Sequence, residues 1–293
     1  MSSFTPAFPH QHTKRPLSQA AQGWQSKWHP LLSPNGQNLI KSQFGVGDWL
    51  IVGCCLQAFI VLVSPCRLIW SLTPTFGLAI WKMFRTLLVI AGWVENPHMK
   101  DVVHGKTTTI FPNPDGSFTR ETGQSIVGKG VVVVMLSSKC NHPLGMMYPP
   151  YKEILAHGRA MFQDLEKNAD EYGLLGYSNY NGTDTTTKSV SMSVLYFTNM
   201  ESLQRYAHVS KQHREGWEWW NQNGDRADEV SIGHEVYDVP EGKWETIYGN
   251  AKPYGFAATT HAIKTHGVER KYVCPIVDNK RMTAPQRMGT VKY

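Results

Sequence analysis

Residues 199–224 read NMESLQRYAHVSKQHREGWEWWNQNG, and residues 230–239 read VSIGHEVYDV. In the first stretch apolar and aromatic residues recur at steps of three and four, which predicts one amphipathic helix. Its stripe consists of Leu203, Tyr206, Ser210, His213, Trp217 and Trp220. The second stretch alternates as a strand does, with one face made of Val230, Ile232, His234 and Val236. Apolar faces of neighbouring elements bury against each other, so His213 and His234 are expected to share one semi-buried space.

The two histidines allow two interpretations. A histidine on an apolar face is often a core residue whose ring nitrogens bond to backbone or water. Two histidines on facing elements, beside Trp217 and Trp220, favour a pocket instead. Trp219 falls off the stripe and is expected to be partly exposed or to face an interface.

The segments that precede this pair complete a known order of elements. The β-branched run GVVVVMLSS at 130–138 predicts a strand, and residues 151–168 predict a helix. The stretches GLLGYSNYNG and KSVSMSVLYFTN then predict two strands. The resulting order, βαββαβ over residues 130–256, is the ferredoxin-like α+β arrangement, with both helices on one face of an antiparallel sheet. The other face, which offers Tyr237 and Val239, is expected to be bare and to pair in a homodimer.

Charge and cysteine content exclude some classes of function. The chain has 293 residues, a net charge of +6 and only 18% charged residues. Seven Lys or Arg against two acidic residues lie in 262–293, so the charge is concentrated in a basic tail expected at 257–293. Without interleaved aromatics this is weak evidence for nucleic acid, and none is expected as a partner. Five cysteines without CxxC or Cys/His spacing predict a reduced protein with no metal site.

The N-terminal third predicts attachment to a membrane. Residues 1–46 are rich in Pro, Ser, Gln and His and are expected to form a disordered lead. Residues 50–66 carry no charge and are long enough for a single membrane span of about 25 Å. The apolar stretch after Pro74 contains Lys82 and Arg85, which favours a helix lying in the headgroup layer over a second span. The region 47–96 is therefore expected to be a span plus an interfacial helix, and 97–129 a linker. A buried core helix is the alternative to the span, and the basic residues on both sides leave the topology undecided.

Several motifs in this order resemble a known family. They are GLLGY at 173–177, HREGW at 213–217, IGHEVYDVPEGKWETIYGN at 232–250, and the pair Pro253 and Gly255. The chain resembles the fungal and bacterial fumagillin-pathway monooxygenase-like family (DUF4188), within the dimeric α/β-barrel superfamily that holds the antibiotic-biosynthesis monooxygenases. Lys252 and Tyr254 depart from the family pattern near the expected pocket mouth. The resemblance implies a dimeric α/β barrel with one pocket in each protomer. It also implies a membrane-anchored fungal member, expected to be single-pass in an endoplasmic-reticulum-type membrane.

The resemblance and the residues together predict an oxygenase of fungal secondary metabolism. The expected reaction is oxidation by O2 of a hydrophobic natural-product intermediate of polyketide or terpenoid type, with no cofactor, since no nicotinamide, flavin or P-loop fingerprint is present. Such a site needs a base, donors and a dry pocket. His234 or His213 is expected to be the base, with His234 favoured because a strand holds its side chain more rigidly. The expected substrate-binding residues are Tyr177, Tyr206, Trp217, Trp220 and Asn221.

Two other functions stay open at this point. One is a haem-dependent lyase of the aldoxime-dehydratase type, or a peroxidase-like enzyme, with His213 or His234 as the axial ligand. The other is a membrane-tethered protein of the same fold that binds a ligand without turnover. A fold of this kind does not choose between them, because one superfamily contains all three chemistries.

Overall fold

The computed structural model describes residues 2–8, 11–16, 40–41, 44–63, 68–121, 128–182, 190–264, 270–279, 282–283 and 287. The chain divides into two compact units. One consists of Met1–Gln43 with Val103–Tyr293, and the other of Phe44–Val102.

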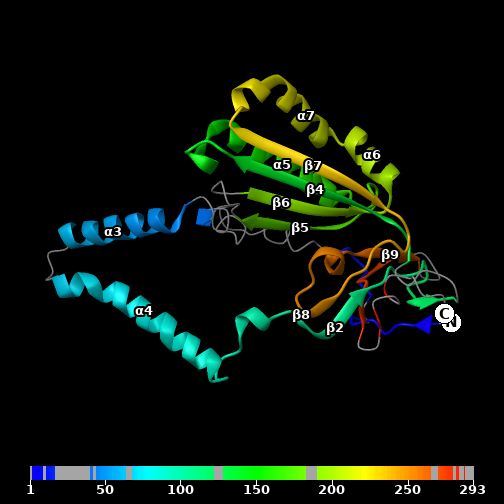
Figure 1. Ribbon diagram of the computed structural model, residues 1–293, viewed down its shortest axis with the longest axis horizontal. Helices are drawn as coiled ribbons and strands as arrows, with labels where there is room; N and C mark the ends of the chain where they lie inside the picture. The colour runs from blue at the N-terminus through cyan, green and yellow to red at the C-terminus, as the bar shows by residue number, and fades with distance from the viewer. Residues whose placement is uncertain are drawn as a thin grey trace. The chain divides into compact units, whose positions relative to one another are not determined.

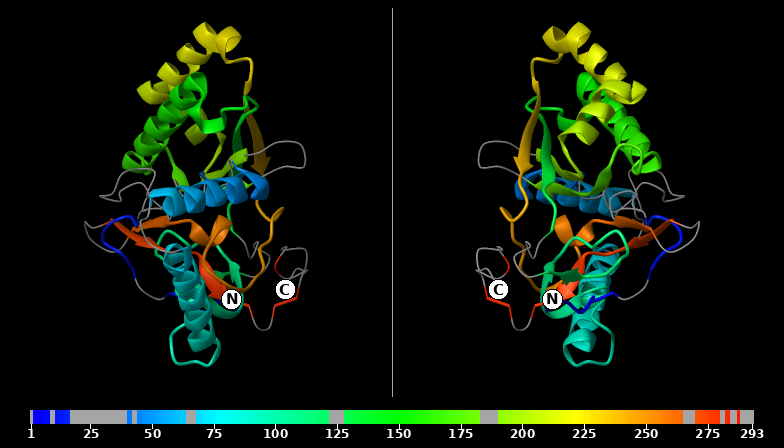
Figure 2. Two further views of the ribbon diagram at one scale, coloured as in Figure 1. Left: turned by 90° about the vertical axis from the view of Figure 1, so that its left-hand side faces the viewer. Right: turned by 90° about the vertical axis from the view of Figure 1, so that its right-hand side faces the viewer.

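The larger unit is built around a four-stranded antiparallel sheet. Its elements in chain order are β4 (Val131–Cys140), α5 (Pro149–Lys167), β5 (Leu174–Gly182), β6 (Val190–Phe197), α6 (Met200–Val209), α7 (Lys211–Asn223) and β7 (Val230–Val239). The strands lie in the order β5-β6-β4-β7 (Figure 1). All three pairings are antiparallel, and the helices lie on one side of the sheet (Figure 2). This order and connectivity confirm the ferredoxin-like fold.

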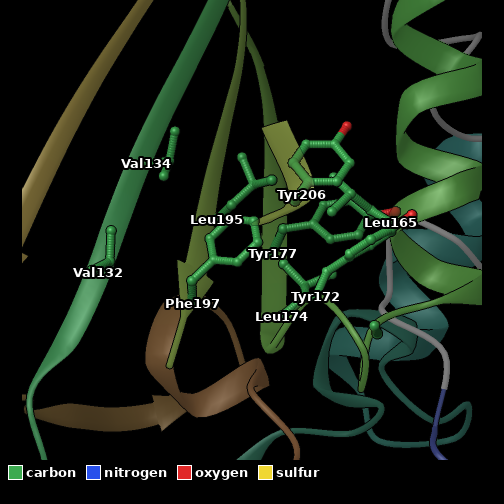
Figure 3. Close-up of a cluster of buried hydrophobic side chains, with 10 residues drawn as sticks. Val132, Val134, Leu165, Tyr172, Leu174, Tyr177, Leu195, Phe197 and Tyr206 are labelled. Carbon is green, nitrogen blue, oxygen red and sulfur yellow. The ribbon is translucent and has the colours of Figure 1, made fainter. Parts of the chain in front are cut away.

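A hydrophobic core lies between the helices and one face of the sheet. The strand register sets the face, because residues directly opposite each other point to the same side. Val132 lies opposite Phe197, and Val134 lies opposite Leu195. These side chains pack with Leu165 of α5 and with the other residues of one buried cluster (Figure 3). The β-branched run of β4 supplies the centre of this core, as the sequence predicted.

The helix predicted over residues 199–224 is two helices. α6 ends at Val209 and α7 begins at Lys211, with Ser210 in an extended conformation between them (φ −62°, ψ 120°). The Ser210 hydroxyl accepts a hydrogen bond from the His213 backbone N–H at 3.2 Å, which caps α7. The Ser210 hydroxyl also donates to the Asp164 carboxylate at 2.7 Å. The break therefore has its own buried polar partners.

Part of the far face of the sheet is covered by the chain itself. Val131, Leu175 and Tyr196 pack there against Phe111 and Trp244. The covering layer contains short strands and one-turn helices: β2 (Val103–Thr109), β3 (Thr119–Arg120), β8 (Tyr248–Ala251), η5 (Gly255–Ala258), β9 (His261–Lys264), β10 (Arg270–Val273) and β11 (Ile276–Asp278). The expected linker at 97–129 and tail at 257–293 thus contain paired strands, in the order β11-β2-β8 and β10-β9. The expectation of a wholly bare face was wrong, because these segments bury one end of it. Further 3-10 turns span η2 (Pro97–Met99), η3 (Gly145–Met147) and η4 (Gly224–Ala227).

The described part of the expected disordered lead also belongs to this unit. β1 (Ser2–Ser3) pairs with β3, and single bridges join Pro6 to Val277 and His12 to Tyr272. Arg15 forms a salt bridge of 2.9 Å with Asp170. Most of these contacts are backbone hydrogen bonds, which form whatever the side chain, so the composition of residues 2–16 did not reveal them.

The second unit contains two apolar helices, α3 (Val46–Val63) and α4 (Leu68–Ile90). No described residue of α3 is buried. In the described part of the chain, α3 is the helix that is long and apolar enough to cross a membrane. α4 continues through Pro74 and touches α3 through a hydrogen bond of 2.9 Å from the Thr75 hydroxyl to the Gln57 side-chain oxygen.

Candidate active site

His234 lies on the helix side of the sheet, near the middle of the edge strand β7. It is opposite Leu136 of β4, which packs against the helix-side core. The predicted strand face is therefore the face that the helices cover. Because β7 is an edge strand, this face stays open: Ile232 is 41% exposed, Val236 is 38% exposed, and His234 is exposed too.

His213 is the more enclosed of the two histidines. It is half-buried in the first turn of α7, with its ring 5.3 Å from the ring of Tyr206 in an edge-on contact. Burial lowers the pKa of His213, while a hydrogen bond to the backbone of Ala207 raises it and the nearby charge of His234 lowers it further. A histidine with a lowered pKa is neutral at pH 7 and can accept a proton.

His213 and His234 both lie on the helix side of the sheet, where their shared site stays a prediction. They come from different elements, and each ring lies within electrostatic range of the other. The two histidines differ in burial: His213 is half-buried against Tyr206, as a core residue would be, whereas His234 is exposed.

A polar row crosses the sheet at the level of His234, and sequence reasoning missed it. His234 is opposite Leu136, Leu136 is opposite Ser193 of β6, and Ser193 is opposite Asn179 of β5. The Ser193 hydroxyl donates to the Asn179 side-chain oxygen at 2.7 Å. The alternation of side chains along β5 and β6 could have revealed this row. Asn179 lies two residues after Tyr177, and Ser193 lies two residues before Leu195, so each shares a sheet face with a core residue.

Open space lies over the sheet at Gly158 of α5. One stripe of this helix holds residues spaced seven, four and three positions apart, which are Tyr151, Gly158, Phe162 and Leu165. Tyr151 and Leu165 are buried on this stripe, yet a Cβ added at Gly158 would meet no atom within 4 Å. Ser138 contacts the Tyr151 hydroxyl at 3.4 Å, and Tyr177 contacts Phe162 at 4.9 Å between rings. The row from His234 to Asn179 lies between those two levels of the sheet, so we expect Gly158 to lie at the level of this row.

The five predicted substrate-binding residues have different surroundings. Tyr177 and Tyr206 are buried in the helix-side core, where Tyr177 packs under Phe162. Trp217 is 57% exposed on α7, four residues after His213. Trp220 packs in a separate cluster with Tyr151 and Val230, and Asn221 is exposed. Tyr206 and Trp217 therefore flank His213, whereas Trp220 and Asn221 lie farther along α7.

The Tyr206 hydroxyl is a buried donor in this region. Tyr206 is 5% exposed; its hydroxyl makes no hydrogen bond of good geometry among the described residues, and its nearest polar neighbour is the Ser210 hydroxyl, which donates to Asp164. Burial raises the pKa of Tyr206, and the charge of Asp164 raises it further, so the phenol stays protonated. A buried donor that lacks a partner costs about 1–3 kcal/mol, which makes a bound molecule or water its expected partner.

Trp219, which was expected to be partly exposed or to face an interface, is half-buried between α7 and α5. Its indole N–H donates to the Glu153 carboxylate at 2.8 Å, and its ring lies 5.8 Å from the ring of His157. Gly216 allows this close approach, because a Cβ there would meet the sulfur of Met161 at 3.2 Å. Trp219 thus joins the two helices and holds α7 in place.

The arrangement suits proton transfer to or from an organic molecule. The helix side of the sheet holds a histidine of lowered pKa, a second histidine open to solvent and the Ser193–Asn179 pair, all beside an apolar core. Among the described residues, no group of three or more His, Cys, Asp or Glu is placed to hold a metal ion.

Comparison with known proteins places this site in a family context. The family model described as "Monooxygenase af470-like" matches residues 131–256, which hold every residue of the site. The chain is 30% identical over 235 residues to the monooxygenase af470 of Aspergillus fumigatus. The match covers 76% of this chain and 82% of that protein.

Solved structures share the arrangement of elements more distantly. The aldoxime dehydratase OxdRE, crystallised with butyraldoxime, is 13% identical with a TM-score of 0.40, over 52% of this chain and 39% of that one. SnoaB, a cofactor-independent oxygenase from Streptomyces nogalater, is 10% identical with a TM-score of 0.25, over 39% of this chain and 96% of that one.

Proposed function

Because the chain belongs to the af470-like monooxygenase family, we propose that it uses O2 to oxidise a hydrophobic, conjugated natural-product intermediate, without a bound cofactor. Membership in the family, expected from the sequence motifs, is confirmed. The observation that carries the proposal is the helix-side face of the sheet, which holds a half-buried histidine of lowered pKa on α7, an exposed histidine on β7 and the Ser193–Asn179 pair, with open space beside the Cα of Gly158 on α5.

In the proposed reaction the substrate supplies its own electrons. His213 removes a proton from a methylene group that the conjugated system acidifies, and the resulting carbanion passes an electron to O2. The two radicals combine into a peroxide, and loss of water leaves a carbonyl. One oxygen atom ends in the product and the other in water, so the CH2 group and O2 give C=O and H2O with no external reductant.

Other side chains have distinct tasks in this scheme. His234 is exposed, so it exchanges the proton of His213 with solvent, and a proton returns by the same route to the peroxide before water is lost. The Asn179 side-chain oxygen accepts from Ser193, which leaves the amide nitrogen of Asn179 to donate to developing negative charge. The apolar core beside the row excludes water and binds the hydrophobic body of the substrate. A polyketide or terpenoid intermediate of fungal secondary metabolism has the required chemistry.

A substitution at Gly158 tests the site. Gly158→Leu should fill the space above the polar row and lower O2 consumption at least about tenfold, because the substrate loses room. Ala156→Leu is the matched control, since Ala156 is exposed on the same helix. Full activity of Gly158→Leu in a folded protein would place the reaction elsewhere.

The absorption spectrum tests the absence of a cofactor. The purified chain should consume O2 with a conjugated phenolic or polyene substrate, with no added cofactor and no Soret band. A Soret band that shifts in His213→Gln or His234→Gln would identify the haem enzyme instead. Ligand binding without O2 consumption would identify a carrier.

Assembly and attachment complete the proposal. Tyr180 of β5 and Tyr237 of β7 are both exposed on the far face of the sheet, beyond the end that the chain covers. We expect a second copy to pair there, giving a homodimer of the larger unit, and a monomer in light scattering at micromolar concentration would contradict this. We also expect the apolar helices α3 and α4 to attach the enzyme to a membrane of endoplasmic-reticulum type.

A further inference from the structure

Residues on both sides of the apolar helices belong to one folded unit. Ser2–Ser3 pair with Thr119 and Arg120, and Pro6 bridges to Val277. Farther along, the His12 backbone exchanges hydrogen bonds of 2.9 Å in both directions with Tyr272, and Arg15 forms a salt bridge with Asp170. The N-terminal segment, residues 2–8 and 11–16, thus contacts residues that follow α3 and α4 in the sequence, from Thr119 to Val277.

This pairing limits how the chain can meet a membrane. A single span between residues 46 and 90 would place the N-terminal segment on one side of the bilayer and its strand partners on the other. The observed hydrogen bonds and salt bridge would then be impossible. The chain must therefore leave the bilayer on the face through which it entered.

The two helices have the features of a hairpin that does so. Trp49 lies 14 residues before Val63, the end of α3, and Trp81 lies 13 residues after Leu68, the start of α4, so each is about 20 Å along its helix from these two adjoining ends. Both tryptophans are exposed. Next to them lie Asp48 and Lys82, the charged residues nearest to the turn within each helix. Tryptophans bordered by charge at equal depth mark the level of an interface.

A polar contact joins the helices halfway along. Thr75 donates to Gln57 at 2.9 Å, and these residues lie about 10 Å from the turn. Gln57 is the uncharged polar residue with the largest hydrogen-bonding need in α3. In hydrocarbon such a side chain needs a partner from a neighbouring helix, and Thr75 provides one.

We propose that residues 46–90 form a helical hairpin that enters and leaves a lipid bilayer through the same face. The N-terminal segment and the enzyme unit stay together on that face. Lys82 and Arg85, which favoured an interfacial helix in the sequence, lie instead at the open end of the hairpin, where they reach the headgroups. This replaces the expected single pass. The proposal rests on the membrane attachment proposed above and not on the reaction.

Protease protection in microsomes tests the topology. The full chain carries one epitope tag at each end and is synthesised with microsomes derived from endoplasmic reticulum. After carbonate extraction the chain should stay with the membranes, and protease added outside should remove both tags. Protection of one tag alone would show a single span and overturn the hairpin. Release by carbonate would overturn both the hairpin and the attachment, and would favour a protein partner for the apolar helices.

Charge substitutions test the depth of the hairpin. Leu56→Lys places a charge in the middle of α3 and should lower the carbonate-resistant fraction at least about fivefold. Met99→Lys is the matched control, since Met99 is an exposed apolar residue outside the two helices. Equal retention of the two variants would contradict insertion. Oxygen consumption by the same proteins in detergent, measured in parallel, tests the proposed reaction independently of membrane insertion.

Discussion

His213 and His234 differ in burial, and burial decides which of them suits a base at neutral pH. The rigid strand position of His234 favoured it in the sequence, but this side chain is exposed. His213 is half-buried, and its pKa is lowered by burial first and by the charge of His234 in addition. We therefore assign the base to His213 and the proton relay to His234.

Replacement of the two histidines separates catalysis from packing. His213→Gln should lower kcat/KM about 10²- to 10⁴-fold with a nearly unchanged melting temperature, whereas His234→Gln should have a smaller effect. A core histidine would behave in the opposite way, with a loss of stability and little change in the activity that survives. Steady-state kinetics and thermal unfolding of both variants distinguish the two cases.

The pH profile gives a second measurement of the same residue. The base must be neutral, so kcat/KM should rise with pH through the lowered pKa of His213 and level off by pH 7. The acid limb should lie below about pH 6.5, the value for a histidine in water. In His213→Gln this limb should disappear from the residual activity. If the acid limb remains unchanged in His213→Gln, it reports the titration of another group.

The Tyr206 hydroxyl tests whether the substrate reaches the helix-side core. Tyr206→Phe removes a buried donor whose one polar neighbour, the Ser210 hydroxyl, is a poorly aligned partner, so stability should change little. If the hydroxyl donates to the substrate, KM or kcat should worsen about 10-fold. Unchanged kinetics would mean that the hydroxyl only fills the core. Tyr177→Phe, in the same cluster, is the comparison variant.

At the scale of elements, the break between α6 and α7 determines where His213 lies. Ser210 caps α7 and donates to Asp164, so it holds the start of the helix against α5. Ser210→Ala should cost about 2 kcal/mol of unfolding free energy through loss of the cap and of a bond to a carboxylate. Ser231→Ala, an exposed serine of β7, should cost almost nothing. Chemical denaturation measures both, and equal costs would contradict the role of the cap.

The sequence predicted the elements whose apolar side chains recur with the period of a strand or a helix. It missed the elements that are held mainly by backbone hydrogen bonds. The run of β4 and the alternation of β7 predicted the correct strands and the correct face for His234. The break between α6 and α7 at Ser210 was missed, because the apolar stripe continues through it. The residue type that indicates a helix start there is a single capping serine. The short strands of the covering layer, such as β11, are too short to show a period. The space at Gly158 was also missed, because a glycine in a helix does not reveal what faces it.

At the scale of the whole molecule, the N-terminal segment is a part of the enzyme unit. A chain that begins at Asp101 lacks β1 and the salt bridge of Arg15 with Asp170. It should melt several degrees below a chain in which a flexible linker replaces residues 44–102 and residues 1–43 are kept. Equal melting temperatures would show that the N-terminal segment adds no stability.

The pairing of the first residues with some of the last also sets the order of events during synthesis. Ser2–Ser3 and Pro6 leave the ribosome long before Tyr272 and Val277 are made. By then α3 and α4 have already emerged. If they form the proposed hairpin in the bilayer, they would keep the unpaired N-terminal strand beside the growing chain. Such a long separation between partners slows folding and leaves strand edges unpaired until the later partner is made. The enzyme unit is therefore complete only after residue 277 has emerged from the ribosome, and a nascent chain stalled before residue 270 should lack these contacts and be more sensitive to protease.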